Sequence, residues 1–102
     1  MRTLPIDMPL AEIDSFCRRH HMVKLSLFGS VLRDDFTSAS DIDVLVEFDP
    51  EHVPGWKFFS MQDELSEMLG RRVDLNTRNS LSPYFVDEVL QDAEVVYERQ
   101  GA

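Results

Sequence analysis

Two strand patterns separated by a Gly-Ser turn occupy residues 25–48, LSLFGSVLRDDFTSASDIDVLVEF. The first apolar run ends at Phe28, breaks at Gly29-Ser30, and continues as a short amphipathic segment over residues 31–33. This pattern indicates a strand that passes into a helix start, where glycine lets the backbone approach a ligand and serine can cap the helix. Because free N–H groups at such a start attract anions, we expect a phosphate site at Gly29-Ser30.

The second strand pattern begins with an Asp-x-Asp sequence. Residues 41–48 read DIDVLVEF, and strand alternation places Asp41 and Asp43 on one face, about 7 Å apart at a rise of roughly 3.3 Å per residue. Adjacent carboxylates repel one another unless a cation lies near, and Mg²⁺ shares oxygen ligands with phosphates. Either element alone has an ordinary structural reading, as a turn or as the start of a strand. Together they predict a metal-bound nucleotide.

The spacing of these two elements resembles the signature of the nucleotidyltransferase superfamily related to DNA polymerase β. Ten residues, 31–40, separate Gly29-Ser30 from Asp41-Ile42-Asp43, and residues 27–33 and 40–46 are similar to the minimal nucleotidyltransferase (MNT) group. The likeness covers nearly the whole chain. It implies a polymerase β palm-like nucleotidyltransferase fold that transfers a nucleoside monophosphate from ATP or another NTP, using two Mg²⁺ ions bound by three carboxylates.

A third acid, Asp74, lies in a further strand pattern over residues 71–76. If this strand pairs beside residues 41–48 in the matching register, Asp74 joins Asp41 and Asp43 on the open face, but sequence does not fix that register. By itself, an aspartate in a strand is more often a solvated side chain. The resemblance implies that Asp74 is a metal ligand or the general base for the attacking hydroxyl. Asp41, Asp43 and Asp74 are therefore the candidate catalytic and metal-binding residues.

Arg33 follows Ser30 by three residues and lies within reach of phosphates gathered at the turn. An ion pair with Asp34, Asp35 or another surface carboxylate is equally consistent with the sequence. Gly29, Ser30 and Arg33 are the candidate nucleotide-binding residues. Some members of the family that the chain resembles carry glycine at the position of Asp34, which leaves the local backbone open.

Composition limits the classes of partner. The 102 residues suit a single domain over 1–102, and a net charge of −9 argues against broad nucleic-acid binding, which requires Lys and Arg. Cys17 is the only cysteine, so neither an intramolecular disulfide nor a cysteine-based zinc cluster can form. Neither a signal peptide nor a membrane-spanning pattern is evident, and we expect a cytoplasmic protein with no membrane partner.

The remaining patterns predict an α/β or α+β domain in which helices flank a small mixed β-sheet. Helices are expected over 9–20, over 56–69 with Gly70 as the C-cap, and from the N-cap Ser82 to about residue 93; an edge strand is expected over 94–98. The basic cluster at 18–24 complements the end of the first helix. We expect Trp56, Tyr84 and Tyr97 to pack rather than to bind a ligand.

Two functions remain. The resemblance implies a Mg-dependent nucleotidyltransferase that transfers AMP from ATP to a hydroxyl group. It also implies that this hydroxyl belongs to a tyrosine of a HEPN-domain toxin, because MNT proteins commonly act as antitoxins to such toxins. The alternative is a non-catalytic antitoxin that neutralises its partner by binding alone. The presence of all three acids and of the Gly-Ser turn favours catalysis. The sequence is compatible with a homo-oligomer and does not specify one.

Overall fold

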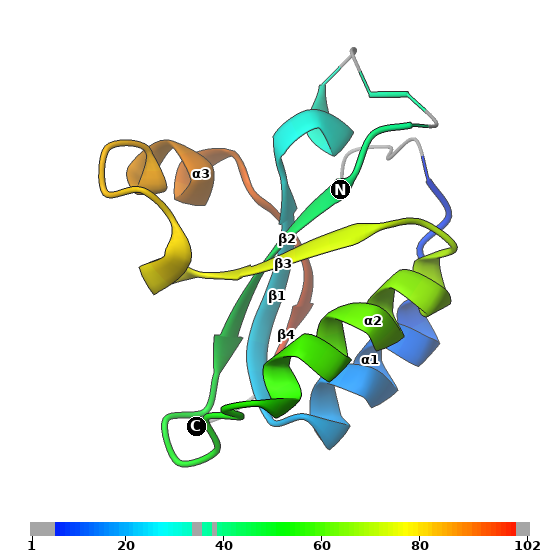
Figure 1. Cartoon of the computed structure of the whole chain (residues 1–102), viewed down its shortest axis with the longest axis vertical. Coiled ribbons are helices and arrows are strands. Elements are labelled where there is room, and N and C mark those ends of the chain that lie inside the picture. The colour runs from blue at the N-terminus through cyan, green and yellow to red at the C-terminus, as the bar shows by residue number, and fades with distance from the viewer. Residues whose placement is uncertain (1–5, 34–35, 38, 100–102) are drawn as a thin grey trace.

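The computed structural model describes residues 6–33, 36–37 and 39–99 (Figure 1). The elements follow in the order α1 (Leu10–Arg19), β1 (Met22–Phe28), the 3₁₀ helix η1 (Gly29–Leu32), β2 (Ile42–Phe48), α2 (Lys57–Leu69), β3 (Val73–Thr77), the 3₁₀ helix η2 (Arg78–Ser80), α3 (Val86–Asp92) and β4 (Glu94–Glu98). The predicted mixture of helices and strands is confirmed, including the edge strand at residues 94–98 and the C-cap at Gly70.

One mixed sheet connects the strands in the spatial order β3-β2-β1-β4. The inner strand β1 is antiparallel to both of its neighbours, β2 and β4, whereas β2 and β3 are parallel. Parallel neighbours need a crossover connection, and α2 supplies it. The prediction of a small mixed sheet flanked by helices is therefore confirmed.

The hydrophobic core lies between the sheet and the two longer helices, α1 and α2, which cover the same face (Figure 1). The helices contribute Ile13, Phe16, Cys17, Met61 and Leu65, and the strands contribute Leu25, Leu27, Ile42, Val44, Val46, Val73 and Leu75. The core residues of β2 and β3 alternate along each strand. Their intervening neighbours, which include Asp43 of β2 and Asp74 of β3, therefore point to the opposite face of the sheet.

Side chains of α2 also fix the outer edge of β3. The backbone N–H of Val73 donates to Ser66 Oγ at 3.0 Å, and the N–H of Leu75 donates to Gln62 Oε1 at 2.9 Å. An edge strand otherwise presents such groups to solvent or to another chain. These two bonds hold β3, and with it Asp74, in place against α2.

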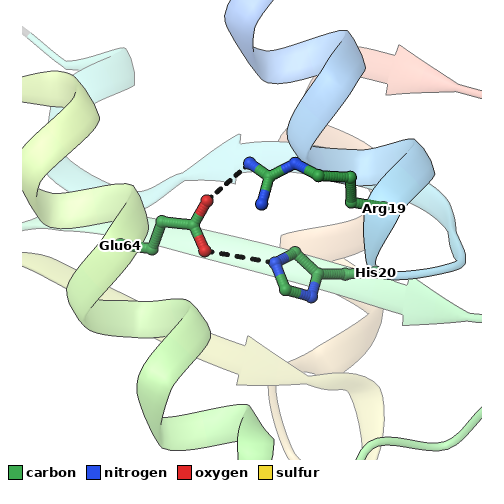
Figure 2. Close-up of polar contacts among 3 residues, drawn as sticks. All are labelled: Arg19, His20 and Glu64. Atoms are coloured by element: carbon green, nitrogen blue, oxygen red, sulfur yellow. Dashed lines mark hydrogen bonds and ion pairs between the residues drawn. The ribbon is translucent and has the colours of Figure 1, made fainter.

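The end of α1 is joined to α2 through Glu64 (Figure 2). Arg19 Nη2 donates to Glu64 Oε2 at 2.6 Å, and His20 Nε2 lies 3.2 Å from Glu64 Oε1. The bond from Arg19, followed by that from His20, holds the pKa of Glu64 below its ordinary value. This part of the basic cluster therefore has a structural role, as predicted.

Three local predictions are wrong. The segment after Gly29 is a four-residue 3₁₀ helix rather than an α-helix start, and Ser30 lies inside it instead of capping it. The last helix begins at Val86, because Ser82 starts a separate turn in which its carbonyl accepts the N–H groups of Phe85 and Val86. The residues that the sequence predicts to face inward from this helix, Val86, Val89, Leu90 and Ala93, are not fully buried, and Leu90 is exposed.

Two aromatic side chains expected to pack are instead exposed: Trp56 by 89% and Tyr84 by 96%. Phe59 is also 64% exposed, because it lies two positions before the buried Met61 and is therefore on the other side of α2. Tyr97 packs against the core, as predicted. No helix in the described part of the chain has the length and apolar character needed to cross a bilayer.

Candidate active site

Gly29 and Asp43 are in close contact where β1 ends. Gly29 has φ +77°, and a Cβ at this position would overlap Asp43 Oδ2 and lie 3.1 Å from Asp43 Cγ. Phe28 is the register partner of Asp43 across the β1–β2 pair, so the carboxylate lies directly beside the turn. Only glycine satisfies both the positive φ and the space that the carboxylate occupies.

Asp74 lies next to Asp43 on the neighbouring strand. In the parallel β2–β3 pair, Asp43 and Asp74 are register partners, and the flanking pairs Ile42–Val73 and Val44–Leu75 are buried in the core. Register partners share a face of the sheet, so both carboxylates lie on the face away from the core. The register that the sequence left open is thus the one that places Asp74 beside Asp43.

The electrostatics of Asp43 identify this place as one of concentrated negative charge. Burial raises the pKa of Asp43 above its ordinary value, and the charges of Asp74 and Asp41 raise it further, whereas the guanidinium of Arg33 lowers it. Three of the predicted charged residues, Asp74, Asp41 and Arg33, therefore act on the fourth, Asp43. A cation at this position would relieve the repulsion.

Asp41 immediately precedes β2 and is turned partly toward solvent. Its Oδ1 lies 4.0 Å from Arg72 Nε, and both side chains are exposed, so the ion pair contributes little. Among the described residues, no group of three His, Cys, Asp or Glu side chains is arranged to hold a metal ion. The structure thus brings Asp41 and Asp74 within electrostatic reach of Asp43 without arranging the three carboxylates around one point.

The residues nevertheless fit a hard divalent cation by their chemistry. Three carboxylates supply the oxygen ligands that Mg²⁺ prefers, and burial and the neighbouring acids destabilise the ionised form of one of them, Asp43. The missing side chain of Gly29 provides the space in which that carboxylate lies.

The two remaining candidate residues are Ser30 and Arg33. Ser30 is in η1, where its carbonyl accepts the N–H of Arg33 at 2.9 Å. The first N–H groups of a 3₁₀ helix have no partner within the helix, so this turn presents donors. Arg33 has an exposed side chain. Its suggested alternative partners, Asp34 and Asp35, lie outside the described residues.

A cavity of about 310 Å³ adjoins this site. Phe28, Gly29 and Arg33 line one side. Phe85, Glu88, Val89 and Asp92 line the other. Sequence reasoning missed the contribution of α3 and its N-cap. The available signal was their spacing, i, i+3, i+4 and i+7, which places these four side chains on one helical stripe.

A larger cavity, about 600 Å³, opens at the other end of β1, beside Met22. Its charged groups are already paired: Arg18 with Asp14 at 2.8 Å, and Arg99 with Asp49 at 2.8 Å. Groups that neutralise one another in this way offer little to a charged ligand. The smaller cavity beside the acids is the more plausible place for chemistry.

A small mixed sheet that carries acids on its open face, beside a Gly-Ser turn, is the architecture of a nucleotidyltransferase. The family model described as "Nucleotidyltransferase domain" matches residues 11–96, and the chain belongs to this family. Protein adenylyltransferase MntA of Thermococcus cleftensis is 34% identical over 99 residues, which cover 88% of this chain and 96% of that protein.

Solved structures agree with this assignment. The structure of a candidate minimal nucleotidyltransferase matches with a TM-score of 0.68 and 32% identity, covering 82% of this chain and 85% of that one. A complex described as the tri-AMPylated Shewanella oneidensis HEPN toxin with MNT antitoxin contains a chain that matches with a TM-score of 0.62 and 21% identity. That match covers 89% of this chain and 71% of the other; at this identity the likeness shows the fold.

Proposed function

We propose that this protein transfers AMP from ATP to a tyrosine hydroxyl of a HEPN-domain toxin and thereby acts as its antitoxin. The observation that carries the proposal is the position of Asp43, which lies against the Gly29 turn with Asp74 beside it on the next strand. The name of the Thermococcus relative, a protein adenylyltransferase, supports the reaction type. The AMPylated toxin in the Shewanella complex supports the kind of acceptor. ATP as the substrate implies a cytoplasmic site of action.

Asp41, Asp43 and Asp74 would hold Mg²⁺, two ions in the scheme that we favour. When bound, Mg²⁺ would neutralise the negative charge on the triphosphate. Small changes in the Asp41 and Asp74 side chains would be needed, and both are exposed enough to move. The carboxylate of Asp43 is already fixed by its contact with the turn.

The protein's own groups then position the reactants. The N–H donors of the Gly29-Ser30 turn bind the β- and γ-phosphates, and Arg33 neutralises charge beside them. Asp74 accepts the proton of the tyrosine hydroxyl as its oxygen attacks the α-phosphorus. A phosphorus–oxygen bond to the tyrosine forms, and the bond from the α-phosphorus to the leaving pyrophosphate breaks. Most of the rate enhancement comes from alignment and from charge stabilisation.

A second candidate function is neutralisation of the toxin by binding alone. The feature that favours it is the spread of the three carboxylates, which in the described residues form no ready metal-binding group. Under this function, the motif would bind nucleotide or have no present role.

The two functions are separated by incubating the purified protein with Mg²⁺, labelled ATP and a HEPN-domain toxin. Label on the toxin is expected with the wild type and with Asp63→Ala, which removes an exposed acid of α2. No label is expected with Asp41→Ala/Asp43→Ala. If the double variant protects cells from the toxin as well as the wild type does, binding alone is the function.

A further inference from the structure

The stripe of α3 that lines the small cavity, together with the turn before it, forms a second feature beside the active site. We infer that this surface, defined by Tyr84, Phe85, Glu88, Val89 and Asp92 and called here the α3 surface, docks a basic segment of the acceptor protein and directs its tyrosine to the reaction centre. This inference rests on the proposed transfer function and specifies where and how the acceptor binds.

The cavity connects the α3 surface to the site of transfer. Its other side is formed by Phe28 and Gly29, and Gly29 is the residue against which Asp43 lies. A volume of about 310 Å³ is at the lower end of the range for ligand sites, about 300–1,000 Å³. It suits one aromatic side chain better than a whole nucleotide. A tyrosine that enters here brings its hydroxyl toward the turn expected to hold the phosphates.

The α3 surface is not used by the protein's own core. Tyr84 is 96% exposed and Phe85 is 43% exposed, and no residue of α3 is buried. The Tyr84 N–H donates to Ser82 Oγ at 3.3 Å, which fixes the turn while the side chain remains free. Aromatic side chains are enriched at protein interfaces.

The charge of this region specifies the chemistry of the partner. Helix α3 contains three acids (Asp87, Glu88 and Asp92) and no Lys, Arg or His. A surface of one sign selects partners of the other sign and steers their approach. A nucleic acid or an anionic nucleotide is disfavoured here, whereas a segment rich in Arg or Lys is complementary.

The two sides of the cavity carry opposite charges, which gives the acceptor an orientation. Arg33 is on the side of the turn, and Glu88 and Asp92 are on the side of α3. Basic residues that flank the tyrosine are attracted to α3 and repelled by Arg33. The tyrosine ring is then held between Arg33 and the acids of α3, next to Phe85 and Val89.

Two synthetic peptides, each with one tyrosine, test the inference: one has arginines on both sides of the tyrosine and the other has glutamates. Binding is followed by amide chemical shifts of the ¹⁵N-labelled protein, and transfer is followed with labelled ATP and Mg²⁺. The arginine peptide should shift the amides of Phe85 and Val89. It should also be labelled at least about tenfold faster than the glutamate peptide, because like charges disfavour the latter.

Substitutions in the α3 surface test whether the arginine peptide binds there. Tyr84→Ala/Glu88→Lys should lose about tenfold in the apparent affinity for the arginine peptide, since it removes an aromatic contact and reverses a charge. Its affinity for ATP should stay unchanged. The control Trp56→Ala/Glu51→Lys makes the same kind of change at two exposed positions outside the α3 surface and should leave both affinities unchanged. The substituted side chains are exposed, so all variants should fold.

The outcomes distinguish this inference from the transfer function. Arginine-peptide binding at α3 without labelling retains the docking surface and contradicts the transferase. Labelling of both peptides at equal rates, or equal rates in the Tyr84→Ala/Glu88→Lys variant, retains the transferase and overturns the docking surface. Weaker ATP binding in that variant would make the cavity a nucleoside site and also overturn the inference, as would the absence of shifts at α3 with millimolar arginine peptide.

Discussion

Gly29 is the residue on which the geometry of the site depends most directly. Gly29→Ala must place a side chain where Asp43 Oδ2 lies and must adopt φ +77°. The positive φ alone costs about 1 kcal/mol, and the displaced carboxylate adds a loss of nucleotide binding. We expect lower stability in urea and no detectable ATP binding in the presence of Mg²⁺.

Gly55→Ala is the matched control, because Gly55 has φ +61° but no atom within 4 Å of its missing Cβ. It should lose a similar amount of stability, about 1 kcal/mol, and bind ATP normally. Normal ATP binding by Gly29→Ala would show that the contact with Asp43 is incidental.

Asp43 makes a pH-dependent contribution of unusual sign. Its folded-state pKa is raised above the ordinary value of 3.8, so its ionisation costs stability as the pH rises through the range above that value. At neutral pH, without divalent cations, Asp43→Asn should therefore be more stable than the wild type. The advantage should disappear in acid, where Asp43 is already protonated.

Addition of Mg²⁺ and ATP should reverse this order, because only the wild type keeps the full set of carboxylates. A ligand at a hundred times its dissociation constant stabilises a protein by about 2.7 kcal/mol. Thermal unfolding across pH, with and without Mg²⁺ and ATP, measures both effects. An Asp43→Asn variant that is less stable than the wild type at pH 7 without Mg²⁺ would contradict the repulsion described here.

At the scale of elements, α2 determines where Asp74 lies. Gln62→Ala removes the acceptor of the Leu75 N–H, and an unsatisfied buried donor costs about 1–3 kcal/mol. The end of β3 should loosen, so that the Leu75 amide exchanges faster with solvent and AMP transfer slows. The neighbouring Asp63→Ala variant, at an exposed position of α2, serves as the control for both measurements. Unchanged exchange at Leu75 would mean that pairing with β2 alone holds the strand.

The elements also show what could be predicted from sequence. The period of two in residues 41–48 and 71–76 places Asp43 and Asp74 each opposite the buried residues of its own strand. The pairing that sets the two acids side by side could not be predicted, because a period of two does not fix the register between strands. The wall made by α3 was missed, since it depends on where a short, unburied helix lies across the sheet. The Ser-Pro sequence before that helix indicated a cap, but Phe85 has a non-helical backbone and the helix starts after it.

At the scale of the whole molecule, the two faces of the sheet have separate tasks. One face is packed against α1 and α2 and supplies the stability (Figure 1). The other presents Asp43 and Asp74 and gives access to the cavity beside α3. A net charge of −9 makes the molecule as a whole complementary to a basic partner, and to a nucleotide whose negative charge is neutralised by a bound cation.

The most direct test of the account is intact-mass spectrometry of a HEPN-domain toxin after incubation with ATP, Mg²⁺ and either the wild type or Asp74→Asn. The substitution keeps the shape of the side chain and removes its charge, so the fold and toxin binding should be retained. We predict AMP adducts on a toxin tyrosine with the wild type and a loss of at least about a hundredfold in their rate of formation with Asp74→Asn, the range expected for a general base. Transfer by Asp74→Asn at the wild-type rate would contradict the account.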